Sequence, residues 1–116
     1  MAIPKIESEA IEQFEVQLRA HPTIERKGAN NPYTSVNGHM FSCVNKDGEV
    51  GLRLSKEDRE AFIREHKTAL LESYGCVMKE YVVVPLAVLK SKKFQGYLNE
   101  SFNYVSSLKP KPTMKG

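Results

Sequence analysis

Two cysteines are the first residues in the sequence that could do chemistry, as a nucleophile or as metal ligands. Cys43 and Cys76 have 32 residues between them, and the chain contains no C-x-x-C pair. This spacing favours neither a zinc knuckle nor a thioredoxin-like redox pair. A nucleophilic thiol also requires a positioned base, and no Cys/His pairing follows from the sequence. We therefore interpret both cysteines as small core residues, and we expect Cys76 to be the more exposed.

The histidines and the known short motifs predict no site either. His21 precedes a proline, His39 falls in a predicted strand, and His66 falls at a predicted helix end, where its charge would favour the helix dipole. The sequence has no H-E-x-x-H or H-x-H pattern, and no G-x-G-x-x-G, phosphate-loop or G-x-S-x-G motif. The sequence therefore predicts no catalytic residue, no metal and no cofactor.

Charged residues inside predicted strands are the remaining candidates. Alternation along a strand would place Lys79 and Glu80 on opposite faces of the sheet, and Arg53 on the outer face, where it could lie near Lys79. We favour a simple cross-strand salt bridge for this charged pair. One of the charges could instead point into a cleft, or an anion could bind on the outer face. An enzyme site assembled from Arg53, Lys79, Glu80 and His39 is a third alternative.

The first element that would position these residues is an amphipathic helix over about residues 6–20. Apolar side chains recur there every four residues, at Ile6, Ala10, Phe14 and Leu18. His21-Pro22 should end this helix, because the residue before a proline is pushed out of the α region. We expect a short edge strand over Thr23–Lys27, followed by a loop rich in Gly, Asn and Pro.

Two hairpins should follow the loop. Asn37-Gly38 is the preferred pair for a tight I′ turn, so Tyr33–Val36 should pair with His39–Val44. A second turn at Lys46-Asp47-Gly48 should join that strand to one whose apolar side chains alternate at Val50, Leu52 and Leu54.

A helix should begin at Lys56, after a possible Ser55 cap, and end near His66. The β-branched run in Val77–Val84 predicts a strand closed by Pro85, and residues 69–74 stay unassigned. Helical spacing from Ser91 to Leu108 predicts a long final helix packed on the sheet. The fold class is therefore α+β: a two-layer fold in which an antiparallel sheet packs against the N-terminal and C-terminal helices.

Length and composition fit one domain, over residues 1–108, with a flexible Lys/Pro-rich tail over 109–116. The chain has 116 residues, of which 41% are apolar, so one core can hold the fold without metal or disulfide. No apolar run is long enough to span a membrane, and the N-terminal residues resemble no signal or transit peptide. We expect a cytoplasmic protein.

The basic residues are concentrated toward the C-terminus. Residues 1–88 carry a net charge of −2 and residues 89–116 a net charge of +5. The simpler interpretation is a solvated surface, and the alternative is weak nucleic-acid binding. The candidate basic patch consists of Lys90, Lys92, Lys93, Lys109, Lys111 and Lys115.

Four segments together resemble the TfoX N-terminal domain family. They are His39-Met-Phe-Ser-Cys-Val, Asp47-Gly-Glu-Val-Gly-Leu-Arg-Leu54, Arg59-Glu-Ala-Phe62 and Val77-Met-Lys-Glu-Tyr-Val-Val-Val-Pro85. The resemblance covers about residues 23–108. It implies a small bacterial α+β domain, found alone or in regulators of competence, with no enzyme chemistry attached. Many members carry Met-Phe-Gly-Gly before the hairpin, whereas this chain has Lys27-Gly-Ala-Asn-Asn-Pro-Tyr33.

The expected function is therefore a non-enzymatic interaction or regulatory module that binds a protein partner or itself. Loops often carry recognition, and the segment with Asn30, Asn31 and Tyr33 is predicted to be exposed. Tyr33 could equally be an anchor that packs on the core. The candidate interaction surface consists of Asn30, Asn31, Tyr33, Arg53 and Lys79.

Overall fold

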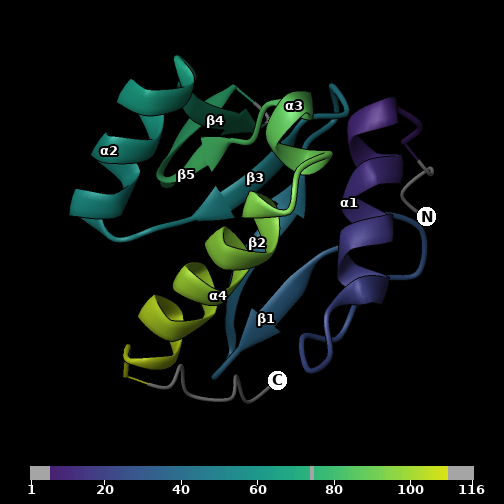
Figure 1. The fold of residues 1–116 in the computed structure, drawn as a ribbon, viewed down its shortest axis with the longest axis horizontal. Helices are drawn as coiled ribbons and strands as arrows, with labels where there is room; N and C mark the ends of the chain where they lie inside the picture. Colours follow the sequence, from purple (N-terminus) through teal and green to yellow (C-terminus); the bar gives the residue numbers. More distant parts are fainter. Residues whose placement is uncertain (1–5, 74, 110–116) are drawn as a thin grey trace.

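The computed structural model describes residues 6–73 and 75–109 (Figure 1). In chain order, the elements are α1 (Glu9–Ala20), β1 (Thr34–Val36), β2 (His39–Val44), β3 (Val50–Arg53), α2 (Lys56–His66), β4 (Leu70–Ser73), β5 (Cys76–Val83), α3 (Leu86–Leu89) and α4 (Lys93–Ser106). The strands form one five-stranded antiparallel sheet in the order β1-β2-β3-β5-β4. The expected α+β architecture is confirmed.

Local signals explain most of these boundaries. Asn37 and Gly38 both have positive φ, 55° and 79°, as the tight turn between β1 and β2 requires. The Ser55 side chain accepts a hydrogen bond from the Asp58 backbone N–H and caps α2 at the expected residue. α2 ends at His66, and Lys67 then adopts the left-handed conformation.

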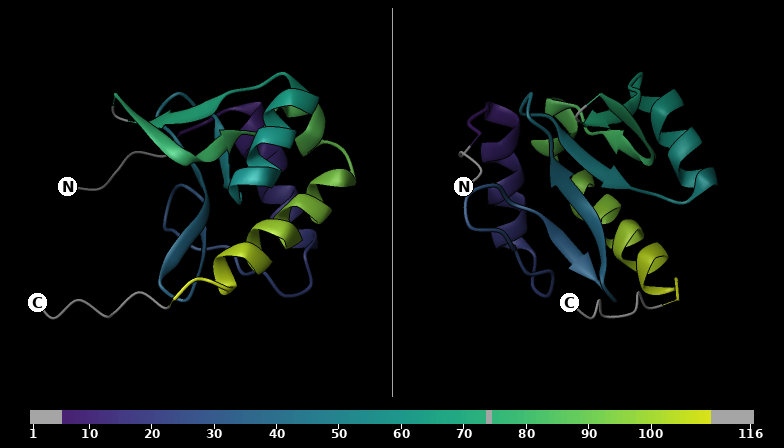
Figure 2. Two further views of the ribbon diagram at one scale, coloured as in Figure 1. Left: turned by 90° about the vertical axis from the view of Figure 1, so that its left-hand side faces the viewer. Right: turned by 180° about the vertical axis from the view of Figure 1, so that it is seen from behind.

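The main core lies between the sheet and the helices, and every helix contributes to it. Phe14 of α1 and Phe94 of α4 are fully buried and meet edge to face, with ring centroids 6.1 Å apart. The expected inner side of the sheet, Val50, Leu52 and Leu54, is buried in the same cluster as Phe94 and Val105 of α4. In the view from behind, β1 and β2 lie in front of α4 (Figure 2).

A second, smaller cluster is built from strand residues: Cys43, Leu71 and Tyr81, with Met40, Met78 and Val83 packed against them. It exists because β2 contains an extra residue. Thr34 pairs with Ser42 and Ser35 pairs with Met40, which leaves Phe41 without its own partner in β1. This bulge turns Phe41 into the main core, while Met40 before the bulge and Cys43 after it both join the second cluster.

The sheet also curls around this second cluster. The Asn45 Nδ2 group, just after β2, donates to the Glu72 carbonyl oxygen of β4 at 2.8 Å, although β2 and β4 are not neighbours in the sheet. The Tyr81 hydroxyl of β5 donates to the Met40 carbonyl oxygen of β2 at 2.6 Å. These two bonds tie the β4–β5 hairpin to β2.

Three parts of the fold differ from the sequence-based expectations. Thr23–Lys27 is not a strand and contributes only an isolated bridge between Lys27 and Tyr33. The His21 Nδ1 atom accepts hydrogen bonds from the backbone N–H groups of Thr23 and Ile24. A side chain therefore holds the start of this segment, and not the backbone hydrogen bonds of a neighbouring strand. The unassigned residues 69–74 include β4, and the short helix α3 follows Pro85.

Gly51 provides a direct test of how closely the sheet curls. A Cβ added to Gly51 would overlap Leu71 Cδ2 and lie 3.3 Å from Leu71 Cγ, and Leu71 is fully buried. We therefore expect Gly51→Ala to lower the free energy of unfolding by about 1–3 kcal/mol, measured by urea denaturation. In the double variant with Leu71→Ala, the loss should be smaller than the sum of the two single losses. Additive losses would mean that the two residues are not in contact.

Candidate functional site

The loop over residues 27–33 is held in one shape by its own backbone and by Arg26. Lys27 and Tyr33 exchange two backbone hydrogen bonds, of 2.8 and 3.0 Å. The Arg26 guanidinium donates to the Gly28 carbonyl oxygen and forms an ion pair with Glu15 of α1. Gly28 has a φ of +98°, and a Cβ there would overlap the backbone of the loop. The loop is therefore preorganised.

The three predicted loop residues have different environments. The Asn31 Oδ1 atom accepts from the Ile6 backbone N–H at 2.7 Å, which fastens the loop to the segment before α1. Asn30 is exposed, and its carbonyl oxygen accepts a long bond, 3.4 Å, from Arg26. Tyr33 is 36% exposed, so it presents part of its ring to solvent while its backbone closes the loop.

A hollow of about 170 Å³, which we call the loop hollow, opens beside this loop. Its walls come from the segment before α1, from the loop, from β2 and its following turn, and from the end of β4: Ile6, Asn31, Pro32, Tyr33, Met40, Cys43, Val44, Asn45, Lys46 and Ser73. The Cys43 side chain is 7% exposed, and burial raises the pKa of its thiol to about 12. The thiol therefore acts as an apolar surface and not as a nucleophile.

A second hollow, which we call the Arg53 hollow, has a volume of about 340 Å³ and is lined by Arg53, Met78, Lys79, Glu80 and Tyr81. The Arg53 Nε atom lies 2.6 Å from Glu80 Oε1. The cross-strand salt bridge favoured for the Lys79/Glu80 pair therefore forms at Glu80, and its partner is Arg53, which alternation had placed near Lys79. The Tyr104 hydroxyl of α4 also donates to the Glu80 carboxylate, at 3.4 Å. Lys79 is exposed and has no ion-pair partner within residues 6–73 and 75–109.

The second cluster connects the two hollows. Met40 and Cys43 line the loop hollow, Met78 and Tyr81 line the Arg53 hollow, and all four belong to one cluster. We call the two hollows, with these four residues, the strand surface. It brings Asn31 and Tyr33 into one hollow, and Arg53 and Lys79 into the other. Neither methionine followed from the sequence, because the faces they occupy depend on strand pairing: β2 has a bulge beside Met40, and the pairing of β5 with β4 shifts register between Leu70 and Glu72.

The residues of the other sequence-based alternatives are dispersed. The His39 Nε2 atom lies 2.8 Å from the Lys109 carbonyl oxygen, and His39 lines neither hollow. Three of the four residues of the enzyme alternative thus lie together, without the histidine. His66 Nε2 lies 2.8 Å from the Tyr97 hydroxyl, between α2 and α4. Within the described part of the chain, no group of three His, Cys, Asp or Glu residues could hold a metal ion.

The candidate basic patch is divided between two places. Lys90 is 3.0 Å from Glu9, and Lys92 and Lys93 stand where α4 begins. Lys109 follows the other end of α4, whose 14 residues span about 21 Å. The remaining two lysines of the patch, Lys111 and Lys115, lie outside the described residues.

The burial of the two cysteines predicts a simple chemical result. Cys43 is buried with a raised pKa, whereas Cys76 is exposed. We expect a thiol reagent such as Ellman's reagent to modify Cys76 within minutes and Cys43 only after unfolding. The expected count is therefore one thiol in buffer and two in denaturant, and Cys76→Ser should remove the fast phase. Rapid reaction of both thiols in buffer would mean that the loop hollow opens to its floor.

Comparison with protein-family models, with curated proteins and with solved structures finds no match to this chain. The resemblance to the TfoX N-terminal domain family therefore stays a prediction. Among the helices of the described residues, none has the length and apolar character that a membrane crossing requires.

Proposed function

We propose that this protein is a non-enzymatic interaction or regulatory module that binds a protein partner through the strand surface. The observation that supports this most is the continuity of that surface. The preorganised loop with the exposed Tyr33 shares one hollow with Met40, Met40 and Met78 pack against the same cluster, and Met78 shares the other hollow with Lys79. The resemblance would place such a module in the bacterial cytoplasm.

The residue types on this surface suit a protein partner. Methionine side chains are flexible and polarisable, so Met40 and Met78 can adapt to the shape of an apolar anchor. Tyrosine gives a large contact area for little conformational entropy, and Tyr33 is held by a closed loop. A loop that is already ordered loses less entropy on binding than a mobile one.

We favour binding over catalysis because two of the three charged groups at the Arg53 hollow, Arg53 and Glu80, are already paired with each other. The Arg53 guanidinium and the Glu80 carboxylate neutralise each other, and Tyr104 donates to the same carboxylate. We favour a protein partner over nucleic acid because the described lysines of the basic patch stand at opposite ends of α4.

The test is affinity capture with the tagged full chain and four variants, followed by quantitative mass spectrometry. Tyr33→Ala and Lys79→Glu alter the strand surface. Two matched controls alter exposed residues of α2, which lines neither hollow: Ala61→Asp replaces an apolar side chain, and Glu60→Lys reverses a charge. We expect one partner, or a second copy of the chain, to be lost about tenfold or more with Tyr33→Ala and retained with both controls.

Native mass spectrometry of the purified chain separates the two kinds of partner. A dimer that Tyr33→Ala converts to monomer would identify the partner as a second copy. Equal recovery of every bound protein with all four variants, together with a monomer at high concentration, would refute the proposal.

A further inference from the structure

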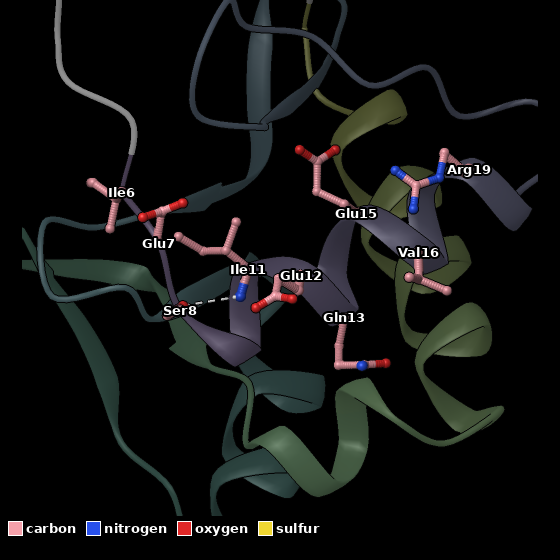
Figure 3. A pocket seen from close by; sticks show the side chains of 9 residues that line it. All are labelled: Ile6, Glu7, Ser8, Ile11, Glu12, Gln13, Glu15, Val16 and Arg19. Atoms are coloured by element: carbon pink, nitrogen blue, oxygen red, sulfur yellow. Dashed lines mark hydrogen bonds between the residues drawn. The ribbon is translucent and has the colours of Figure 1, made fainter.

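A third hollow lies along α1, and none of the five residues of the candidate interaction surface lines it. It has a volume of about 480 Å³ and is drawn in Figure 3. We call it the α1 hollow. It is lined by Ile6, Glu7, Ser8, Ile11, Glu12, Gln13, Glu15, Val16 and Arg19. Figure 3 shows Ile6 toward one end, Arg19 toward the other, and the three glutamates between them.

This hollow is preformed because α1 is fixed along its length. The Ser8 hydroxyl donates to the Gly48 carbonyl oxygen at 2.7 Å and caps the helix. The Gln17 side chain donates to the carbonyl oxygens of Leu89 and Ser91, at 2.7 and 3.0 Å. With the Phe14 ring packed in the main core, the helix cannot rotate to bury its outer face.

The hollow has an apolar part that solvent reaches. Val16 is 48% exposed, whereas Ile11, five residues earlier, is 4% exposed, and Ile6 is half-buried. Val16 is one of three large apolar residues that are exposed among the described residues, and it is the one that lines this hollow. An apolar side chain from a partner would remove Val16 from water at little cost in rearrangement.

The charges around this apolar part are mainly negative. Glu7 and Glu12 are exposed, and neither has an ion-pair partner among residues 6–73 and 75–109. Glu15 pairs with Arg26, and Arg19 is the cation that lines the hollow. Three carboxylates and one guanidinium give the lining a formal charge of −2. This charge disfavours phosphates and other anions and favours a ligand that carries ammonium or guanidinium groups.

We propose that the α1 hollow is a docking site for a basic amphipathic segment of a protein partner. One apolar side chain of that segment would cover Val16, on the Arg19 side of Ile11. Lysine or arginine side chains toward the Ile6 end of the hollow would pair with Glu7 and Glu12. The site shares Ile6 with the loop hollow, but Val16, Glu7 and Glu12 line only the α1 hollow, and the proposal does not rest on the function proposed for the strand surface.

The apolar part decides between a peptide and a free polyamine. A polyamine could pair with the two glutamates, but it has no branched side chain to cover Val16. A basic peptide segment supplies both groups from one backbone, with charged and apolar residues at helical spacing. The charge complementarity and the exposed apolar floor together therefore point to a peptide segment.

The test uses fluorescence anisotropy of a labelled helical peptide of about 14 residues, with lysines on one face and a leucine stripe on the other. The full chain is titrated into this peptide and into an isomeric peptide with the same residues scrambled. Two variants alter the hollow, Glu12→Lys and Val16→Asp. Two matched controls make the same kinds of change on other surfaces, Glu60→Lys and Val77→Asp.

We expect Glu12→Lys and Val16→Asp each to weaken binding by about tenfold, and both controls to change it less than about twofold. The patterned peptide should bind more tightly than the scrambled one, and spermidine should compete poorly. Circular dichroism of each variant checks that the helix content is unchanged. Equal losses with control and hollow variants, equal binding of the scrambled peptide, or efficient competition by spermidine would each overturn the proposal.

Discussion

Phe94→Ala is expected to lower the free energy of unfolding by about 3–5 kcal/mol, which is a large part of the 5–15 kcal/mol typical of a domain. Phe94 is fully buried in α4 and meets Phe14 of α1 edge to face. Truncation would leave a cavity where α1, α4 and the sheet converge, and it would remove the aromatic contact as well. Urea denaturation followed by circular dichroism gives the measurement.

A matched aromatic on the surface provides the control. Tyr33→Ala removes a ring of similar size that is 36% exposed, and it should cost less than about 1 kcal/mol. A loss of under about 1 kcal/mol for Phe94→Ala would mean that α4 does not pack on α1 and the sheet as described.

Asn45→Asp should also destabilise the fold strongly, because Asn45 is 2% exposed and both the oxygen and the nitrogen of its amide form hydrogen bonds. Its Nδ2 group donates to Glu49 Oε1 at 2.9 Å and to the Glu72 carbonyl oxygen at 2.8 Å. Its Oδ1 atom accepts from the backbone N–H groups of Asp47 and Glu49. An aspartate would keep the Oδ1 acceptor but lose both N–H donors. Its buried carboxylate would then face Glu49 Oε1 and the Glu72 carbonyl oxygen with no hydrogen between them. We expect Asn45→Asp to lower the free energy of unfolding by about 2–4 kcal/mol at pH 7.

The sign of the pH dependence follows from the same contacts. Burial and the neighbouring oxygens would raise the pKa of the new carboxyl in the folded state. The difference in free energy of unfolding between the variant and the parent chain should therefore shrink as the pH falls and the carboxyl is protonated. Asp47→Asn, an exposed change in the same turn, is the control and should show no such trend. A deficit that stays constant from pH 7 to about pH 4 would contradict this arrangement.

Much of the fold follows from local signals in the sequence. The turn at Asn37-Gly38 and the cap at Ser55 depend on backbone conformations that few residues adopt, and so they identify the boundaries of β1, β2 and α2. β4 carries no such signal. Leu71 is buried because the sheet curls onto Gly51, which is a tertiary contact that no four-residue segment reveals.

The candidate site was predictable only in part, for the same reason. The composition of the loop predicted an exposed segment with Tyr33. The strand pattern predicted a cross-strand salt bridge for a charged residue of β5, which is Glu80. Sequence analysis did not identify Met40, because the bulge at Phe41 changes which side chains share a face. The α1 hollow was missed as well, since helical periodicity marks the face that packs and not the hollows on the opposite face.

Hydrogen–deuterium exchange of the chain with and without its captured partner tests the strand surface most directly. The account predicts that the partner slows amide exchange in peptides that cover residues 27–46 and 76–81, and leaves exchange in α4 unchanged. Slowing confined to α4, or no change over residues 27–46, would contradict it.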